Sequence, residues 1–192
     1  MNDSSISPVV LPAALRDAGE RCGELLIERN ETVTVAEGSC GGLIATALLA
    51  VPGASAYFRG GAVIYTQWAL KGMLSGIVEP PQDLQGASEP WALHLARAAR
   101  AHVRTHWAIG EGGAAGPSGN RYGNPAGYAW VAVVGGETRP VGEAASADAA
   151  VEVTENVETG QSDRLTNMTA FAVAGLQLLA ATLEARSQGD GE

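Results

Sequence analysis

A β-branched segment that runs into a glycine loop and then into an apolar segment most constrains the fold of this chain. Glu31 to Ala36 (ETVTVA) alternates in the way typical of a strand, and Leu43 to Leu49 is apolar and of helical length. The pattern predicts a strand, the loop Glu37 to Gly42 (EGSCGG) and a helix. Such a loop lets backbone N–H groups approach an anion closely. It equally suits a plain turn in which Ser39 caps the helix.

Other segments show helical or extended patterns. Apolar residues recur at helical spacing in Leu11–Leu26, Trp68–Leu74, Trp91–Val103 and Leu165–Ala185. Extended patterns occupy Ala54–Thr66, as two short runs broken at Gly60-Gly61, and also Trp107–Ile109, Tyr128–Val134 and Val151–Val157, the last two expected to pair. Gly110 to Pro125 contains six glycines and two prolines, which predicts an irregular loop, and Glu143 to Ala150 is expected to be a surface turn.

Strands that alternate with helices predict an α/β fold. We expect a three-layer α/β/α sandwich with a mixed or mainly parallel sheet, formed by a single domain over residues 8–186. Residues 1–7 and 187–192 are polar and expected to be loose ends. Ligands in such folds bind beyond the carboxyl ends of strands, where the glycine loops after Val35 and Ile109 are predicted to lie.

Charge and hydropathy exclude several classes of partner. The chain has 12 Lys and Arg against 21 Asp and Glu, a formal net charge of −9, which disfavours nucleic-acid binding. No basic leader precedes an apolar segment, and no uninterrupted apolar run reaches the roughly 18 residues of a membrane span. We therefore expect a cytoplasmic protein with no membrane contact. Cys22 and Cys40 are expected to be free thiols, and the spacing of the three histidines favours no metal site.

Several polar residues could serve a small-molecule pocket. Tyr65-Thr66 ends a predicted strand, and Lys71 could activate a serine, although a wet-tipped core tyrosine and a solvated lysine are the ordinary alternatives. Glu111 could act as a base or a ribose ligand, and Asn120-Arg121 forms the polar tip of the second glycine loop, which could also be only a connector. Arg164 could clamp a phosphate at the start of the last helix.

Ordered motifs over roughly residues 10–185 resemble the CinA C-terminal domain family. AEGSCGGL is similar to that family's AESCTGGL, VPGAS to its VPGSS turn, and IYT to its strand that ends in Tyr and Ser or Thr. GASEPWA, GAAGPSG and SDR are similar to its G-A-V-S-E, G-I-A-G-P-x-G and G-D-R segments. Active members are nicotinamide-mononucleotide deamidases, so the resemblance implies hydrolysis of a carboxamide to a carboxylate and ammonia by a serine, assisted by a tyrosine and a lysine.

The resemblance keeps some of the family's functional positions and changes others. The family's glutamate and tyrosine fall on Glu37 and Tyr65. Its serine falls on Gly38, with Ser39 at the neighbouring cysteine position, and its lysine falls on Leu70, one place before Lys71. The hydroxyl residue before G-I-A-G-P becomes Gly112, and the arginine of the last helix becomes Met168.

The resulting hypothesis is an amidohydrolase of the nicotinamide-mononucleotide deamidase type, with Ser39 as nucleophile, Tyr65 and Lys71 assisting, and loop amides stabilising an oxyanion. The predicted substrate-binding residues are Glu37, Gly38, Gly41, Gly42, Thr66, Glu111, Gly116, Asn120, Arg121 and Arg164. The substrate is a small pyridine mononucleotide or similar amide, no cofactor or metal is expected, and the apolar last helix suggests a homo-oligomer. A catalytically altered nucleotide-binding or regulatory protein, or a purely structural oligomer, are the alternatives.

Overall fold

A computed structural model of the chain describes residues 10–74, 76, 78, 80, 85–136 and 151–189. The predicted loose N-terminus, the turn at Glu143–Ala150 and residues 190–192 of the predicted tail lie outside these described residues. The helices are α1 (Ala13–Glu28), α2 (Leu43–Leu49), α3 (Gln67–Met73), α4 (Glu89–Val103) and α5 (Arg164–Gly189), with a 3₁₀ turn at Ala54–Ala56. The strands are β1 (Val33–Glu37), β2 (Phe58–Val63), β3 (Trp107–Ala114), β4 (Tyr128–Gly135) and β5 (Val151–Glu158).

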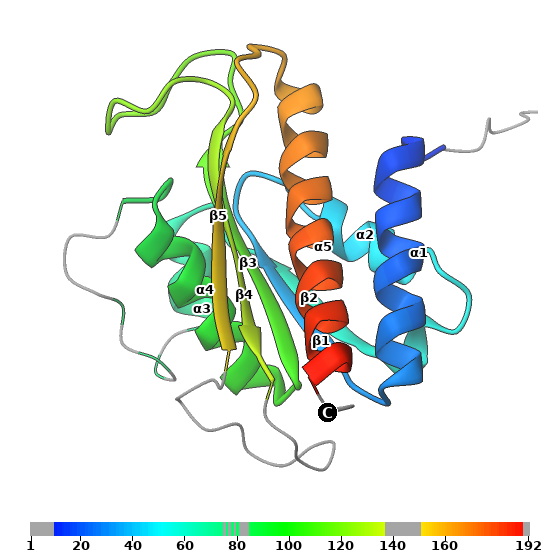
Figure 1. The fold of residues 1–192 in the computed structure, drawn as a ribbon. Coiled ribbons are helices and arrows are strands. Elements are labelled where there is room, and N and C mark those ends of the chain that lie inside the picture. Colours follow the sequence, from blue (N-terminus) through cyan, green and yellow to red (C-terminus); the bar gives the residue numbers. More distant parts are fainter. Residues whose placement is uncertain are drawn as a thin grey trace, which may run out of the picture.

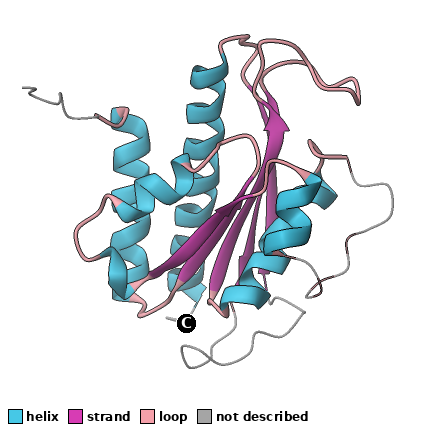
Figure 2. Ribbon diagram, turned by 180° about the vertical axis from the view of Figure 1, so that it is seen from behind, coloured by secondary structure: helices cyan, strands magenta, loops and turns pink. Residues whose placement is uncertain are grey.

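The strands form one mixed sheet in the order β2-β1-β3-β4-β5. β1 runs parallel to both β2 and β3, whereas β4 is antiparallel to β3 and to β5. Helices α1, α2 and α5 cover one face, and α3 and α4 cover the other (Figures 1 and 2). The predicted three-layer α/β/α sandwich and the pairing of β4 with β5 are confirmed.

The two faces of the sheet are packed with side chains of different size. Large residues such as Leu26, Ile109 and Leu176 fill the core under α1, α2 and α5. Small residues dominate where α4 crosses β3 and β4, including Ala96 and Ala132. Each fully buried large apolar side chain contributes roughly 1.5–3 kcal/mol, so the first face supplies most of the hydrophobic stabilisation.

Helix α5 is apolar along most of its length. Among the described residues, its stretch Arg164–Ser187 is long and apolar enough to cross a membrane, with a mean hydropathy of 1.4 over an 18-residue window of which 33% is buried. Phe171, Leu176 and Leu183 on this helix are fully buried in the core. One face of α5 therefore packs as a core helix of the sandwich, which accounts for the apolar residues on that face.

Strand β2 differs from the two short runs predicted for Ala54–Thr66. After the 3₁₀ turn, Phe58–Val63 forms one continuous strand beside β1. Val33 pairs with Phe58 while Thr34 pairs with Gly60, so one residue bulges between them, and Gly60 has a φ of +140°. The predicted irregularity at the glycines is present as a bulge, but it bends the strand without ending it.

The prediction that irregular structure begins at Gly110 is wrong, because β3 continues to Ala114. The glycines there allow α4 to pack closely against the strand. A Cβ at Gly110 would lie 2.0 Å from the carbonyl oxygen of Ala92, and a Cβ at Gly112 would lie 2.3 Å from Cδ1 of Trp91. These glycines therefore serve packing, and the loop is confined to the residues between β3 and β4.

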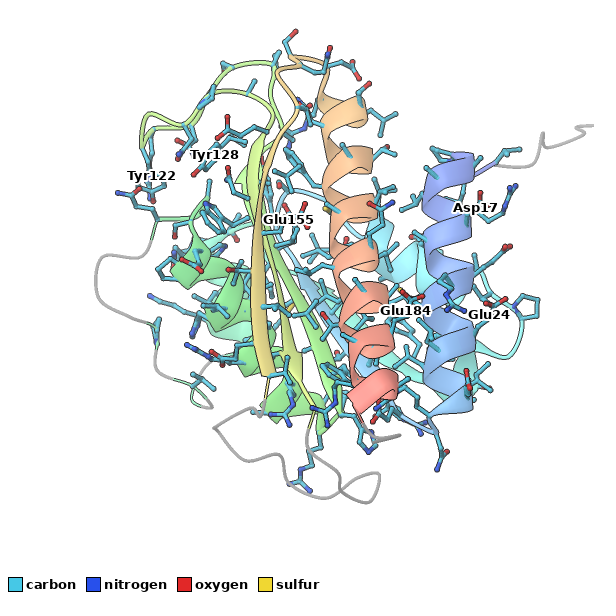
Figure 3. All side chains as sticks on the ribbon, in the orientation of Figure 1. Asp17, Glu24, Tyr122, Tyr128, Glu155 and Glu184 are labelled. Atoms are coloured by element: carbon cyan, nitrogen blue, oxygen red, sulfur yellow. The ribbon has the colours of Figure 1, made fainter. Side chains whose placement is uncertain are left out.

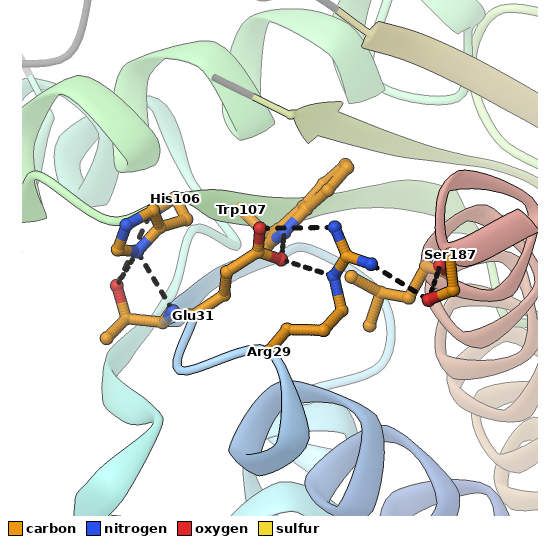
Figure 4. Close-up of polar contacts among 7 residues, drawn as sticks. Arg29, Glu31, His106, Trp107 and Ser187 are labelled. Atoms are coloured by element: carbon orange, nitrogen blue, oxygen red, sulfur yellow. Dashed lines mark hydrogen bonds and ion pairs between the residues drawn. The ribbon is translucent and has the colours of Figure 1, made fainter. Parts of the chain in front are cut away.

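A polar network ties the amino ends of β1 and β3 to the helices, at the end of the sheet opposite to the glycine loops (Figure 4). Glu31 accepts hydrogen bonds from Arg29 Nε at 2.9 Å and from Trp107 Nε1 at 2.7 Å, and Arg29 also donates to Ser187 of α5. Nδ1 of His106 accepts the N–H of Thr32 at 3.1 Å. These contacts occupy His106 in fixing the strand ends.

Candidate functional site

The carboxyl ends of β1 and β3 meet, with Glu37 paired to Glu111, and the two glycine loops leave the sheet side by side. Two adjoining hollows of about 470 and 240 Å³ lie there. Their described lining residues are Gly38, Ser39, Ile64, Tyr65, Thr66, Gln67, Gly86, Trp91, Gly113, Ala114, Ala115, Gly116, Ser118, Gly119, Asn120, Arg121, Tyr122 and Arg164. Ser39, Tyr65, Gly113 and Asn120 line both, so we treat the hollows as one site. The predicted pocket therefore has a place in the fold.

Ser39 lies at the junction of the two hollows, with only 6% of its surface exposed. Its Oγ donates a hydrogen bond to Oε1 of Glu111, a fully buried residue of β3. Oε2 of Glu111 accepts the N–H groups of Gly38 at 3.1 Å and Cys40 at 2.8 Å. A Cβ at Gly113 would lie 2.9 Å from Ser39 Oγ, so glycine there leaves room for the hydroxyl.

Glu111 is therefore a strand residue beneath the site, and it is not among the lining residues of either hollow. A residue that binds a ribose directly would have to line the hollow, so the predicted role as a ribose ligand is not supported. Burial raises the pKa of this carboxyl above its ordinary value, and the hydrogen bonds from Ser39 and Cys40 oppose that rise. The sequence showed Glu111 as a candidate base but gave no sign of its partner. The structure places a carboxylate against a serine hydroxyl, which is the arrangement of an activated nucleophile.

Glu37 caps helix α2, and it is not among the lining residues of either hollow. Its carboxylate accepts the N–H groups of Gly42, Ile44 and Ala45 at 2.8–3.0 Å, and 1% of the residue is exposed. The predicted substrate contact is corrected to a helix cap, because the end of β1 turns this side chain towards the helix N-terminus. Burial raises the pKa of Glu37 to about 7, against the opposing effect of the N–H groups.

The raised pKa of Glu37 predicts that stability falls as pH rises. Between its ordinary pKa of 4.5 and its folded pKa of about 7, the folded chain binds more protons than the unfolded chain. We expect the free energy of unfolding at pH 5 to exceed that at pH 8 by about 2 kcal/mol from this group. Glu111 contributes with the same sign, since its pKa is also raised. Urea unfolding at pH 5 and pH 8 measures this difference in the free energy of unfolding. If Glu37→Gln shows the same difference as wild type, Glu37 is not its source.

The glycines of the first loop divide between lining and turning. Gly38 lines the larger hollow, whereas Gly41 and Gly42 have φ of +66° and +100° and form the turn into α2 outside the lining. The N–H groups of Gly38, Cys40 and Gly42 bond to the two carboxylates. The hypothesis that these loop amides hold an oxyanion is therefore wrong for these three residues.

Tyr65 and Arg164 join two walls of the site. Nη1 of Arg164 donates to the carbonyl oxygen of Gly116 at 2.7 Å, and Nη2 donates to the Tyr65 hydroxyl at 3.4 Å. Tyr65 is 66% exposed, so its phenol is a wall of the hollow and not a core side chain. Asp163 caps α5 by accepting the N–H of Thr166 at 2.8 Å, which fixes the helix end that carries Arg164.

Lys71 is exposed on α3 and is not among the lining residues. Leu70, at the position of the family's lysine, is buried in the core beneath α3. Thr66 lines the larger hollow, and its hydroxyl also caps α3 by accepting the N–H of Ala69 at 3.2 Å. The structure thus does not bring Lys71 to the hollow with Ser39.

The loop between β3 and β4 extends past the sheet on the side of α3 and α4, with Tyr122 on it (Figure 3). Oδ1 of Asn120 accepts the N–H groups of Tyr122 and Asn124, at 3.0 and 3.1 Å, which closes the turn. The guanidinium of Arg121 stacks 4.8 Å from the Tyr122 ring centroid. The predicted residues Asn120 and Arg121 therefore lie on a folded wall of the site.

Sequence reasoning missed Gln67 and Trp91 in the lining and Asn167 behind it. Asn167 is fully buried, and its amide donates to the carbonyl oxygens of Ala115 at 2.8 Å and Gln161 at 3.0 Å. It thereby joins the end of β3 to α5. A polar residue one turn into an otherwise apolar helix was the available signal.

The loop from Glu37 to Gly42, the β3–β4 loop and the start of α5 correspond to the motifs noted in the sequence. Residues 16–183 match the CinA C-terminal domain. The chain belongs to the CinA C-terminal domain family. Its CinA domain is similar to a CinA-like protein of Prochlorococcus marinus, 38% identical over 135 residues, which make up 70% of this chain and 28% of that protein. A CinA-like protein of Gloeobacter violaceus is 40% identical over 119 residues, 61% of this chain and 28% of the relative.

Solved structures share the CinA fold over nearly the whole chain. The competence/damage inducible protein CihA from Agrobacterium tumefaciens has a TM-score of 0.76 and 25% identity, covering 92% of this chain and 99% of the other. A competence-damaged protein (CinA) superfamily protein from Klebsiella pneumoniae has a TM-score of 0.76 and 22% identity, covering 89% and 98%. This chain therefore spans under a third of the two curated relatives but nearly the full length of these two solved structures.

Proposed function

We propose that this CinA domain is an amidohydrolase that converts the carboxamide of a pyridine mononucleotide into a carboxylate and ammonia. The observation that carries the proposal is Ser39, whose hydroxyl lies at a 470 Å³ hollow and contacts a buried carboxylate. A hydroxyl so placed can attack a carbonyl carbon and form an acyl-enzyme. The CinA domain is known for nicotinamide-mononucleotide deamidation, which supplies the class of substrate.

The charge of the hollow supports an anionic substrate. Arg121 and Arg164 both line it, and none of its described lining residues is an Asp or Glu, although the whole chain carries −9. A guanidinium binds a phosphate with two parallel hydrogen bonds, and Arg164 is the better placed because its helix and Gly116 fix it. Tyr122 and Trp91 offer aromatic surface to a pyridine ring.

Ammonia release from nicotinamide mononucleotide tests the proposal, with nicotinamide riboside as the substrate that lacks the phosphate. We expect wild-type protein to prefer the mononucleotide and Arg164→Ala to raise its KM by at least about tenfold, because a charged hydrogen bond contributes about 1.5–3 kcal/mol. Arg16→Ala is the matched control, since Arg16 is exposed on α1 and its ion-pair partners among the described residues are acids of the same helix. Equal rates on both substrates, or none on either, would contradict the proposal.

A second candidate is a nucleotide-binding module without turnover. Gly38 stands at the position of the family's serine, and Leu70 at that of its lysine is buried, which favours it. Calorimetry that shows mononucleotide binding without ammonia release would select this function. The predicted homo-oligomer and cytoplasmic location stay predictions, which sedimentation velocity and cell fractionation check.

A further inference from the structure

We infer that Glu111 is the general base that takes the proton from the Ser39 hydroxyl. The inference rests on the proposed function for its reaction. It gives Glu111 the activation of Ser39, the role that the sequence analysis considered for Lys71. It starts from one contact: the Ser39 Oγ donates to Oε1 of Glu111, a residue within β3 that lies 72 residues away in sequence.

The carboxylate is fixed in the orientation that a base requires. Oε2 of Glu111 accepts the N–H groups of Gly38 and Cys40, one residue on either side of the serine, which leaves Oε1 directed at Ser39. Serine nucleophiles are activated by an adjacent base that a third group orients. Here the backbone on both sides of the nucleophile itself supplies that third group.

The other ionisable groups near the site are less suited to take a proton from Ser39. Both oxygens of Glu37 are occupied by the N–H groups of α2, Lys71 is exposed outside the lining, and Arg164 carries no free electron pair. The Cys40 thiol also hydrogen-bonds to Glu111, but it is fully buried, and burial raises its pKa well above the ordinary value, so it stays protonated. Glu111 is thus the carboxylate in direct contact with the hydroxyl.

Burial also suits Glu111 to this work. It raises the pKa of the carboxyl and so makes the carboxylate a stronger base, while the hydrogen bonds from Ser39, Cys40 and Gly38 favour the ionised form. A base whose pKa approaches the working pH transfers protons most effectively.

The step balances with water as the only co-reactant. Oγ bonds to the carboxamide carbon as its proton moves to Oε1, and the C–N bond then breaks while that proton passes to the nitrogen, which leaves as ammonia. Water attacks the ester on Ser39, Glu111 accepts one of its protons, and that proton returns to Oγ as the C–O ester bond breaks. The product is a carboxylic acid, which loses the remaining proton of the water to solvent and becomes the carboxylate, and both residues are restored.

A fluorophosphonate probe tests the base independently of the substrate, because it traps an activated serine by forming an O–P bond with loss of fluoride. We expect wild-type protein to be labelled at Ser39, and Glu111→Gln to be labelled about 10²–10⁴-fold more slowly. The melting temperature of Glu111→Gln, measured in parallel, shows whether the variant is folded. Glu111→Asp, which keeps a carboxylate, should recover part of the rate. The labelling rate of the wild-type protein should fall as the pH is lowered and Glu111 becomes protonated. The pH–rate profile of Glu111→Gln should lack this acidic limb.

Glu37→Gln is the matched control, since Glu37 is equally buried and bonded to backbone N–H groups but does not touch Ser39; its labelling should fall far less. If Glu111→Gln is labelled at the wild-type rate, the assignment of Glu111 as the base is overturned, while the proposed amidohydrolase function is unaffected. Glu111-dependent labelling without ammonia release would support the base and overturn the proposed reaction, and absence of both would overturn both. If Glu111→Gln fails to fold, Glu111→Asp takes its place in the test. An acidic limb of the labelling pH–rate profile that does not shift in Glu111→Asp would overturn the assignment of Glu111 as the base.

Discussion

Ammonia release should fall about a thousandfold or more when Ser39 is replaced by alanine, because no other described hydroxyl contacts Glu111. Mononucleotide binding should persist, since Arg164 and the aromatic lining residues Trp91 and Tyr122 are unchanged. Initial rates of ammonia release and calorimetric titration of the same preparation measure the two effects.

Ser55→Ala is the matched control for this substitution, since Ser55 is exposed on the 3₁₀ turn and is not among the lining residues of the hollow. It should keep the wild-type rate. A Ser39→Ala protein that releases ammonia at more than a tenth of the wild-type rate would exclude Ser39 as the nucleophile.

Gly110→Ala should have the largest effect on stability. The added Cβ would lie 2.0 Å from the carbonyl oxygen of Ala92 and 2.7 Å from the N of Ala96, both in the backbone of α4. Neither atom can rotate away, so α4 must move off the sheet, at a cost of about 3 kcal/mol or more. Urea unfolding followed by circular dichroism measures the loss.

Gly72→Ala provides the control for Gly110→Ala. Gly72 lies in α3 with nothing within 4 Å of its Cβ position, and alanine is the better helix former by up to about 1 kcal/mol. We expect this variant to be as stable as wild type or slightly more stable. Equal losses in both variants would show that close packing by α4 does not explain the glycine at position 110.

Local patterns predicted the layers of this fold and the end of the sheet at which the hollow lies. The helical spacing from Leu165 onward marked α5, and the alternation in Tyr128–Val134 marked β4, because each element buries one face on its own sheet or helix neighbour. The glycine loop after β1 marked the hollow, since it follows the carboxyl end of a strand.

The error at Gly110 shows where local patterns stop being informative. A glycine that permits φ above zero and a glycine that permits a helix to pack closely look identical in sequence. Only the position of α4 over Ala92 and Ala96 separates the two uses, and that position depends on the complete sandwich.

The partners of the two buried glutamates were likewise beyond the sequence. Glu37 and Glu111 are paired on adjacent strands, yet one caps α2 and the other contacts Ser39. Which helix end or hydroxyl each carboxylate meets is set by the strand order and by the turn after β1. Resemblance to the family identified Glu37 and Tyr65 but could not connect Ser39 with Glu111.

The mass of the protein during turnover tests the central claim most directly. Acid-quenched wild-type protein mixed with nicotinamide mononucleotide should carry the acyl group of the substrate on the peptide that contains Ser39, and Ser39→Ala should carry none. Ammonia release by wild-type protein with no adduct on that peptide, and undiminished release by Ser39→Ala, would contradict the account.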